Sequence, residues 1–170
     1  MIMKPKLAGP GIAGIWICFS CLLLMPAWAD DLRVGRAEVN ITPPLGMPMG
    51  GLFYIRLSTG GHDDLHAKAL VLEKDGVKMA LVACDLVGMP ARIVQATRQL
   101  IEKTSGLQGD RVMISGTHTH TGPEMDPIIL AGVQKETSKI VEEYFASLPV
   151  KIAECVRLAE IGRASCRERV

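Results

Sequence analysis

The chain has 170 residues, of which 48% are hydrophobic, and its 19 basic side chains nearly balance its 18 acidic ones, giving a formal net charge of +1. It contains no basic patch, no aromatic platform and no nucleic-acid-binding motif, so we exclude a nucleic-acid partner. Its length suffices for one modest domain after a short leader.

The first 29 residues have the features of a secretory signal peptide. Lys4 and Lys6 give a basic start, residues 12–25 form an apolar run, and a small-x-small cleavage site ends at Ala29. The apolar run is shorter than the ~20 residues that a membrane-spanning helix needs. We therefore predict a signal peptide over residues 1–29, a secreted or periplasmic protein, and no transmembrane anchor after cleavage.

The first segments after the leader predict a strand and a structured loop. Residues 32–39 alternate apolar and polar side chains, as a strand with one buried face does. Residues 40–51 contain three prolines and three glycines, which favour an extended, turn-rich path. Apolar side chains such as Met47 and Met49 distinguish this loop from a flexible linker, because linkers are polar.

Two apolar runs, residues 67–73 and 77–86, predict a β-hairpin. The pair Asp75-Gly76 between them suits the positive φ angles of a tight two-residue turn. Pairing across such a turn places Asp85 opposite His66 at the far end of the hairpin.

Residues 89–105 have the apolar period of a helix, and residues 111–115 form a short apolar strand. The order strand, helix, strand predicts a parallel pair with a right-handed crossover. Asp85 and His118 then lie at the carboxyl ends of neighbouring strands, the edge at which open α/β sheets bind ligands.

Two amphipathic stripes, residues 140–148 and 148–159, predict two covering helices with a break at Pro149. We therefore predict an α/β fold over residues 30–160: a mixed sheet with a β-hairpin, a βαβ crossover and covering helices. Residues 161–170 are basic and lack an apolar period, so we expect a non-native tail and a chain shorter than the natural protein. Cys84 and Cys155 fall in apolar segments and are expected to be buried thiols.

Residues 116–123 contain two of the four histidines, His118 and His120, directly after an apolar strand. Side chains two apart on an extended segment point to the same side, so both imidazoles can face one point. The hairpin and the crossover predict that His62, Asp63 and Asp85 gather on the same rim, where they would orient metal ligands through hydrogen bonds.

The chemistry of the histidine pair has two interpretations. A His-x-His pair supplies two neutral nitrogen ligands, and catalytic zinc takes about three protein ligands and a water. Alternatively, the two rings are structural histidines at a strand end. The metallo-β-lactamase pattern is excluded, because Thr-Gly-Pro follows His120 where that pattern requires x-Asp-His. For His62 and His66, a structural role is favoured over ligation.

Several segments resemble the amino-terminal catalytic domain of the neutral/alkaline ceramidase family. The most specific is Thr-His-Thr-His-Thr-Gly-Pro, and all of them occur in the family's order: residues 34–44, 46–50, 62–73, 85–88 and 117–123. After Pro123 the chain reads Glu-Met-Asp-Pro, where well-known members of the family have glycines, so the wall of the substrate cleft is expected to differ from theirs.

The resemblance implies an incomplete part of a larger catalytic domain of a zinc (Zn²⁺) amidase. Such an enzyme hydrolyses the N-acyl amide of ceramide, presented at a membrane or micelle surface, to a sphingoid base and a fatty acid. It further implies that His118 is a zinc ligand and that His120 is a catalytic residue that hydrogen-bonds the substrate or the tetrahedral intermediate. With two nitrogen ligands at most, this chain alone is expected to be inactive. The alternatives are an exported zinc amidase or esterase with another substrate, and a non-catalytic secreted domain of the same fold.

Overall fold

The computed structural model describes residues 32–161 and 164–165, all within one compact unit, Asp31–Val170. The predicted signal peptide over residues 1–29 therefore lies outside the described residues. No helix in the described part of the chain is long and apolar enough to cross a membrane.

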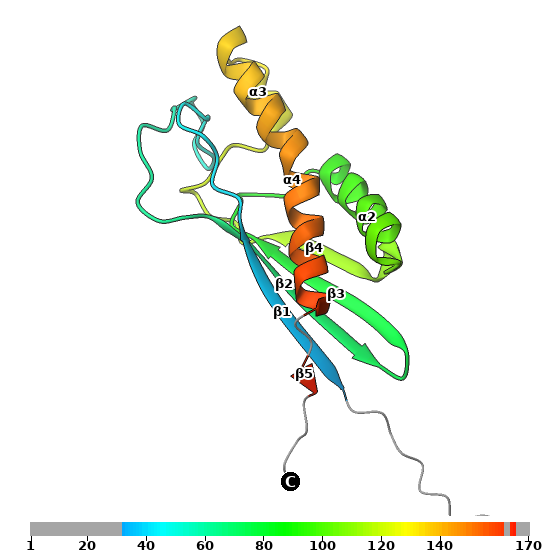
Figure 1. Ribbon diagram of the computed structural model, residues 1–170. Helices are drawn as coiled ribbons and strands as arrows, with labels where there is room; N and C mark the ends of the chain where they lie inside the picture. Colours follow the sequence, from blue (N-terminus) through cyan, green and yellow to red (C-terminus); the bar gives the residue numbers. More distant parts are fainter. Residues whose placement is uncertain (1–31, 162–163, 166–170) are drawn as a thin grey trace, which may run out of the picture. The chain divides into compact units, whose positions relative to one another are not determined.

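The described residues form one mixed sheet (Figure 1). Its strand order is β4-β3-β2-β1-β5, and only the pair β3 and β4 is parallel. The strands are β1 (Arg33–Asn40), β2 (His66–Lys74), β3 (Val77–Cys84), β4 (Val112–Gly116) and β5 (Ala164–Ser165). This arrangement confirms the predicted α/β fold, with its hairpin and its crossover. β5 lies in the segment predicted to be a non-native tail, and the origin of that segment stays a prediction.

The hairpin register is the predicted one. Lys74 pairs with Val77 across the turn, and the Asp85 N–H donates to the His66 carbonyl at 2.9 Å. Asp75 and Gly76 both have positive φ, 51° and 75°, as a tight two-residue turn requires.

Two long helices, α2 (Ala91–Ser105) and α4 (Lys135–Ile161), lie on the same face of the sheet (Figure 1). Both bury apolar side chains: Ile93 and Ile101 of α2 are buried, and Leu148 and Ile152 of α4 are completely buried, as is Val71 of β2. The short elements η1 (Gly109–Arg111) and α3 (Pro127–Leu130) lie in the connections before β4 and before α4.

The predicted break at Pro149 is wrong, because α4 continues through it as one helix. Proline removes one backbone donor, so the Phe145 carbonyl loses its helical partner. Burial of Leu148 and Ile152 on either side keeps both halves of the helix on the sheet, and this packing offsets the local loss.

A buried hydrogen bond ties α4 to the loop after β1. The Tyr144 hydroxyl donates to the Ile41 carbonyl at 2.7 Å, and both residues are buried. We expect Tyr144→Phe to lower the free energy of unfolding by about 1–3 kcal/mol, because the carbonyl loses its partner. Urea titration measures this change, and Tyr54→Phe is the control because Tyr54 is 63% exposed. Equal effects of the two variants would contradict the prediction.

Cys84 and Cys155 are free and buried, as predicted. Burial raises the pKa of the Cys84 thiol from 9.0 to about 12, with smaller contributions from Cys155 and Asp85. Burial likewise raises the pKa of the Cys155 thiol from 9.0 to about 11. The folded protein therefore keeps both protons at pH values at which the unfolded chain has lost them.

This difference predicts a pH dependence of stability. Because the folded-state pKa values are raised, the contribution is fully present below pH 9.0 and is lost as pH rises towards 11–12. Urea midpoints at pH 7 to 11 should fall above pH 9 in the wild type. The decrease in the urea midpoint above pH 9 should be smaller in the double variant Cys84→Ala/Cys155→Ala. If the midpoints of the two proteins decrease in parallel with pH, the two thiols do not cause the pH dependence.

Candidate active site

The candidate site lies beyond the carboxyl ends of the parallel strands β3 and β4. After Gly116 the chain stays close to the segment that follows β3: the Thr117 N–H donates to the Cys84 carbonyl at 2.9 Å, and the His118 N–H to the Leu86 carbonyl at 3.0 Å. A Cβ at Gly116 would lie 2.8 Å from the Leu86 oxygen, so only glycine permits this approach. The backbone thereby delivers His118 to the predicted edge of the sheet.

His118 takes a conformation that the sequence does not predict. Its φ is +64°, in the left-handed region that residues other than glycine seldom occupy, so the pair is not on an extended segment. Its ring Nδ1 lies 2.7 Å from the Val87 carbonyl oxygen, so Nδ1–H donates and the lone pair lies on Nε2. Backbone strain of this kind concentrates at functional sites.

The His120 ring meets that of His118 edge to face, with ring centroids 5.0 Å apart and an interplanar angle of 69°. The two Nε2 atoms are 3.4 Å apart. The His120 ring also packs against Gly51, where an added Cβ would lie 2.3 Å from His120 Cγ. The structure therefore brings the two imidazoles together, as predicted, by a different backbone path.

The 3.4 Å separation fits both interpretations of the pair. Two nitrogens that bind a tetrahedral zinc at about 2.0–2.1 Å are roughly 3.3–3.4 Å apart. Alternatively, one Nε2 carries a proton and donates to the other. Because the Val87 carbonyl fixes the tautomer of His118, its Nε2 has the lone pair that a metal needs. The two histidine nitrogens thus fit two ligand positions of a zinc site. In the described part of the chain, no group of three or more His, Cys, Asp or Glu side chains is arranged to hold a metal.

Asp85 lies beneath the histidine segment. One carboxylate oxygen accepts the His66 N–H at 3.0 Å, and the other accepts the Thr117 hydroxyl at 3.4 Å. Lys68 Nζ is 3.7 Å from the same carboxylate. Asp85 therefore links β2 to the start of the histidine segment through Thr117, and its influence on the ligands stays a prediction.

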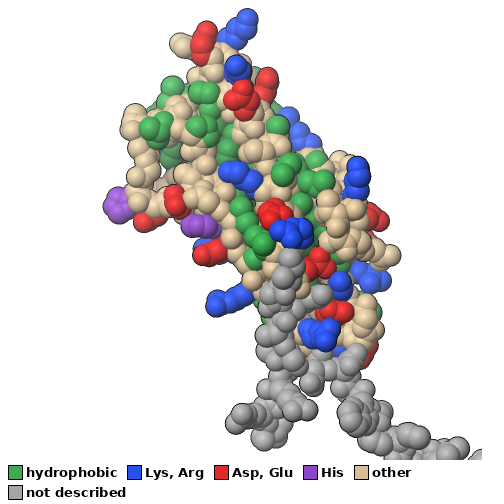
Figure 2. All heavy atoms as spheres, in the orientation of Figure 1, with side chains coloured by type: hydrophobic (Ala, Val, Ile, Leu, Met, Phe, Trp, Pro, Cys, Tyr) green, Lys and Arg blue, Asp and Glu red, His purple; other side chains and the backbone are tan. Residues whose placement is uncertain are grey.

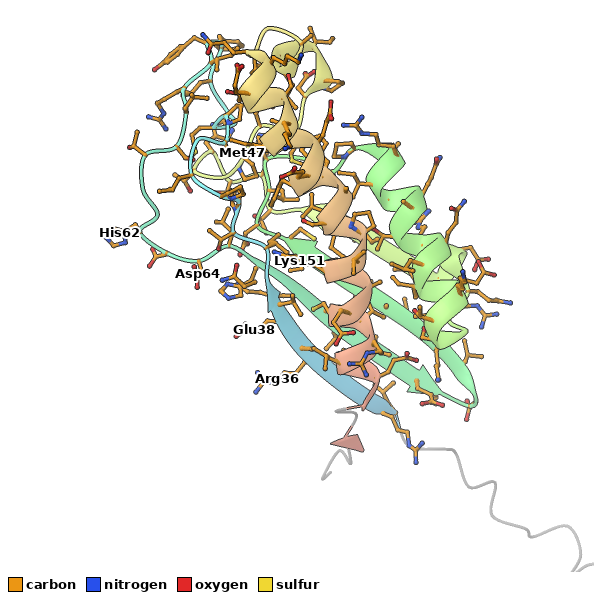
Figure 3. All side chains as sticks on the ribbon, turned by 45° about the horizontal axis from the view of Figure 1, so that its top comes forward. Arg36, Glu38, Met47, His62, Asp64 and Lys151 are labelled. Carbon is orange, nitrogen blue, oxygen red and sulfur yellow. The ribbon has the colours of Figure 1, made fainter. Side chains whose placement is uncertain are left out.

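His62 and Asp63 do not join the pair. Both are more than 90% exposed and contact each other, with Nδ1 3.4 Å from Oδ2. Figure 3 shows His62 on the outside of the loop that precedes β2. Before β2, the Ile41 N–H donates to the Leu65 carbonyl, and the Leu65 N–H donates to the Thr42 hydroxyl. These bonds continue the pairing of β1 with β2 and direct the preceding residues outward.

The histidine pair opens into an apolar cavity of about 560 Å³. Its lining combines both histidines with apolar side chains, among them Leu52, Phe53, Met89, Met125 and Ile129. His62 and Asp63 line a different hollow, which shares no lining residue with this one.

Three contributors to the site have little or no sequence signal. Gly51 supports His120 and Val87 orients His118 through its carbonyl oxygen, which any residue would supply. Glu124 also lines the cavity and is 4% exposed, and its Oε1 accepts the N–H groups of Met125 and Asp126, each at 2.8 Å. Only the Gly50-Gly51 pair and the acidic residue after Gly-Pro mark these positions in the sequence.

Comparisons with known proteins agree with the motifs. No family model matches the chain. A curated relative, the neutral ceramidase of Pseudomonas aeruginosa, is 36% identical over 120 residues, which cover 63% of this chain and 18% of the relative.

Solved structures give the same result for the fold. The crystal structure of the Pseudomonas aeruginosa neutral ceramidase superposes with a TM-score of 0.69 at 22% identity, over 80% of this chain and 22% of that one. A ceramidase complexed with C2 superposes with a TM-score of 0.65 at 23% identity, with the same coverage. The chain is thus similar in sequence and fold to part of a neutral ceramidase and spans about a fifth of its length, which confirms the predicted resemblance.

Proposed function

We propose that these residues belong to a zinc-dependent hydrolase that cleaves the N-acyl amide of ceramide, or of a closely related lipid, to a sphingoid base and a fatty acid. The observation that carries the proposal is the pair of Nε2 atoms of His118 and His120, 3.4 Å apart at an apolar cavity. The similarity to a neutral ceramidase supports both the ceramide-hydrolase activity and the lipid amide substrate. The signal-peptide pattern supports export to the periplasm or the medium.

The two histidines have separate roles in this proposal. His118, held by the Val87 carbonyl, presents Nε2 to zinc. When bound, zinc polarises a carbonyl and lowers the pKa of water. The His120 ring, supported by Gly51, donates a hydrogen bond from Nε2 to the oxyanion that develops on the amide carbonyl.

The cavity accounts for recognition of an apolar substrate. Side chains such as Leu52, Met89 and Ile129 offer an acyl chain a surface that excludes water. Glu124 is buried in the same wall, at a position where the sequence departs from the family, and it holds the loop ahead of α3 through two backbone N–H groups. We therefore expect the fit of the lipid to differ from that of well-known ceramidases.

In this assignment zinc receives one nitrogen from the described residues, that of His118, and the rest of its shell comes from other donors, because catalytic zinc takes about three protein ligands. We therefore propose that the 170-residue chain by itself binds zinc weakly and hydrolyses little or no ceramide.

The test has two parts. Zinc is titrated into the metal-free chain against a chromophoric chelator, and we expect binding that depends on His118. The natural gene product that contains these residues is then assayed for release of fatty acid from ceramide, before and after removal of zinc. Zinc-dependent release supports the proposal. Release from a simple ester or a short amide, but not from ceramide, would favour an esterase or amidase on another substrate. Metal binding without hydrolysis of any of these would favour a non-catalytic domain.

A further inference from the structure

Residues 46–58 form a loop that projects beside the cavity. Its two arms are joined by backbone hydrogen bonds from Gly46 N to Ser58 O at 3.0 Å, Ser58 N to Met47 O at 2.9 Å, and Met49 N to Arg56 O at 2.7 Å. Met47 at the base of the loop is completely buried, and Figure 3 shows it inside the molecule. The end of the loop, residues 52–57, is therefore held out from the core on a fixed stem.

This projecting end carries large apolar side chains that the described residues leave partly or fully exposed. Phe53 is fully exposed, at 107%, and Tyr54, Ile55 and Leu57 are 63%, 39% and 44% exposed. Ile128 of α3, the neighbour in sequence of the cavity-lining Ile129, is 82% exposed. Figure 2 shows hydrophobic side chains at the surface of this end of the molecule, near the start of α4. We call the exposed apolar residues of the loop end, together with Ile128, the apolar rim.

The rim is continuous with the candidate site. Phe53 and Ile129 line the cavity, and the Ile55 side chain reaches the turn after α3, where its Cδ1 lies 3.5 Å from a Cβ built at Gly132. Gly51, one residue before the loop end, supports the His120 ring. Whatever covers the rim therefore also lies against the mouth of the cavity.

We propose that the apolar rim docks the protein onto a lipid bilayer, with the cavity mouth facing the lipid. A narrow projecting loop is suited to insertion between lipid headgroups, whereas a protein partner needs a surface of about 800 Å² on each side. Tyr54 and Arg56 have apolar stems and polar ends, which suits the boundary between headgroups and acyl chains. Arg56 is the one formal charge of the loop end, so docking relies on apolar burial rather than on anionic lipid. The inference rests on the proposed function in one respect: docking is useful to the protein because a lipid amide can then pass from the bilayer into the cavity without crossing water.

The experiment measures binding to vesicles rather than hydrolysis. Because the described residues form one compact unit with its own core, Asp31–Val170 is used, which leaves out the apolar run of the leader. Sedimentation with phosphatidylcholine vesicles gives the partition coefficient of the wild type, Phe53→Ser and Ile128→Ser. Each substitution should lower it about tenfold, because each removes a large apolar side chain from the lipid contact. Val77→Ser is the matched control: Val77, the first residue of β3 after the β2–β3 turn, is 55% exposed, and this turn lies at the opposite end of the sheet from α3 (Figure 1).

Vesicle binding that is lost in both rim variants and kept in Val77→Ser supports docking. Equal binding by all four proteins overturns it. Docking is also overturned if gel filtration shows that the wild type is a dimer and that both rim variants are monomers, since the rim would then bind a second copy. A negative ceramide assay would not affect the measured partition coefficients. The docking proposal and the proposed function can therefore be refuted independently.

Discussion

Replacing His118 with alanine is expected to remove the weak zinc binding of this chain and, in the natural gene product, both high-affinity zinc binding and ceramide hydrolysis. His118 Nε2 has a free lone pair because Nδ1 donates to the Val87 carbonyl at 2.7 Å. Loss of groups that merely orient metal ligands costs about 10–100-fold in metal affinity or activity, so loss of the ligand itself should exceed about 100-fold. The measurements are zinc affinity by chelator competition and the initial rate of fatty-acid release.

Two further variants make this result specific. Alanine is strained at the His118 φ of +64°, so His118→Gly removes the imidazole at a position whose backbone suits glycine. Both variants should lose zinc to the same extent. His62→Ala should bind zinc like the wild type, because His62 is 99% exposed and lines the other hollow. Unchanged zinc affinity in His118→Gly would remove His118 from the metal site.

Gly51→Ala is expected to reduce hydrolysis by about 100-fold while zinc binding through His118 persists. The new Cβ would lie 2.3 Å from His120 Cγ and 2.5 Å from Nδ1, so the ring must move. A displacement of about 1 Å of a positioned group is enough for a loss of this size. Initial rates and zinc affinity, measured on the same preparations, separate the movement of His120 from the loss of metal.

Gly76→Ala is the matched control for backbone strain. Gly51 and Gly76 have similar φ angles, +81° and +75°, but nothing lies within 4 Å of a Cβ at Gly76. The backbone strain should therefore cost both variants similar stability, the contact with His120 should add a further cost in Gly51→Ala, and only Gly51→Ala should affect catalysis. If the two variants hydrolyse ceramide equally well, the contact between Gly51 and His120 has no catalytic role.

Local patterns were sufficient for most of the fold. The Asp75-Gly76 turn determines the register of β2 and β3, because a two-residue turn leaves one pairing. The crossover between β3 and β4 follows from the order of an apolar strand, an amphipathic helix and a second strand. The predicted break in α4 at Pro149 was wrong, because burial of side chains on both sides of the proline outweighs one missing backbone hydrogen bond.

The candidate site was less predictable than the sheet. The proximity of His118 and His120 was expected on the assumption that their segment is extended. In the structure His118 has a left-handed backbone conformation, and the two rings still meet. His62 and Asp63 were expected on the same rim and lie in another hollow, because hydrogen bonds just before β2 send their loop outward.

The sequence by itself determined the strands β1 to β4, the crossover and the edge of the sheet that carries the histidines, since these depend on turn chemistry and on apolar periodicity. Only the tertiary structure decided which atoms surround the two rings. The Val87 carbonyl that orients His118 and the glycine surface behind His120 have no side chain to mark them. They reach the site because distant segments pack together, and a close backbone approach of this kind leaves no periodic signal in the sequence.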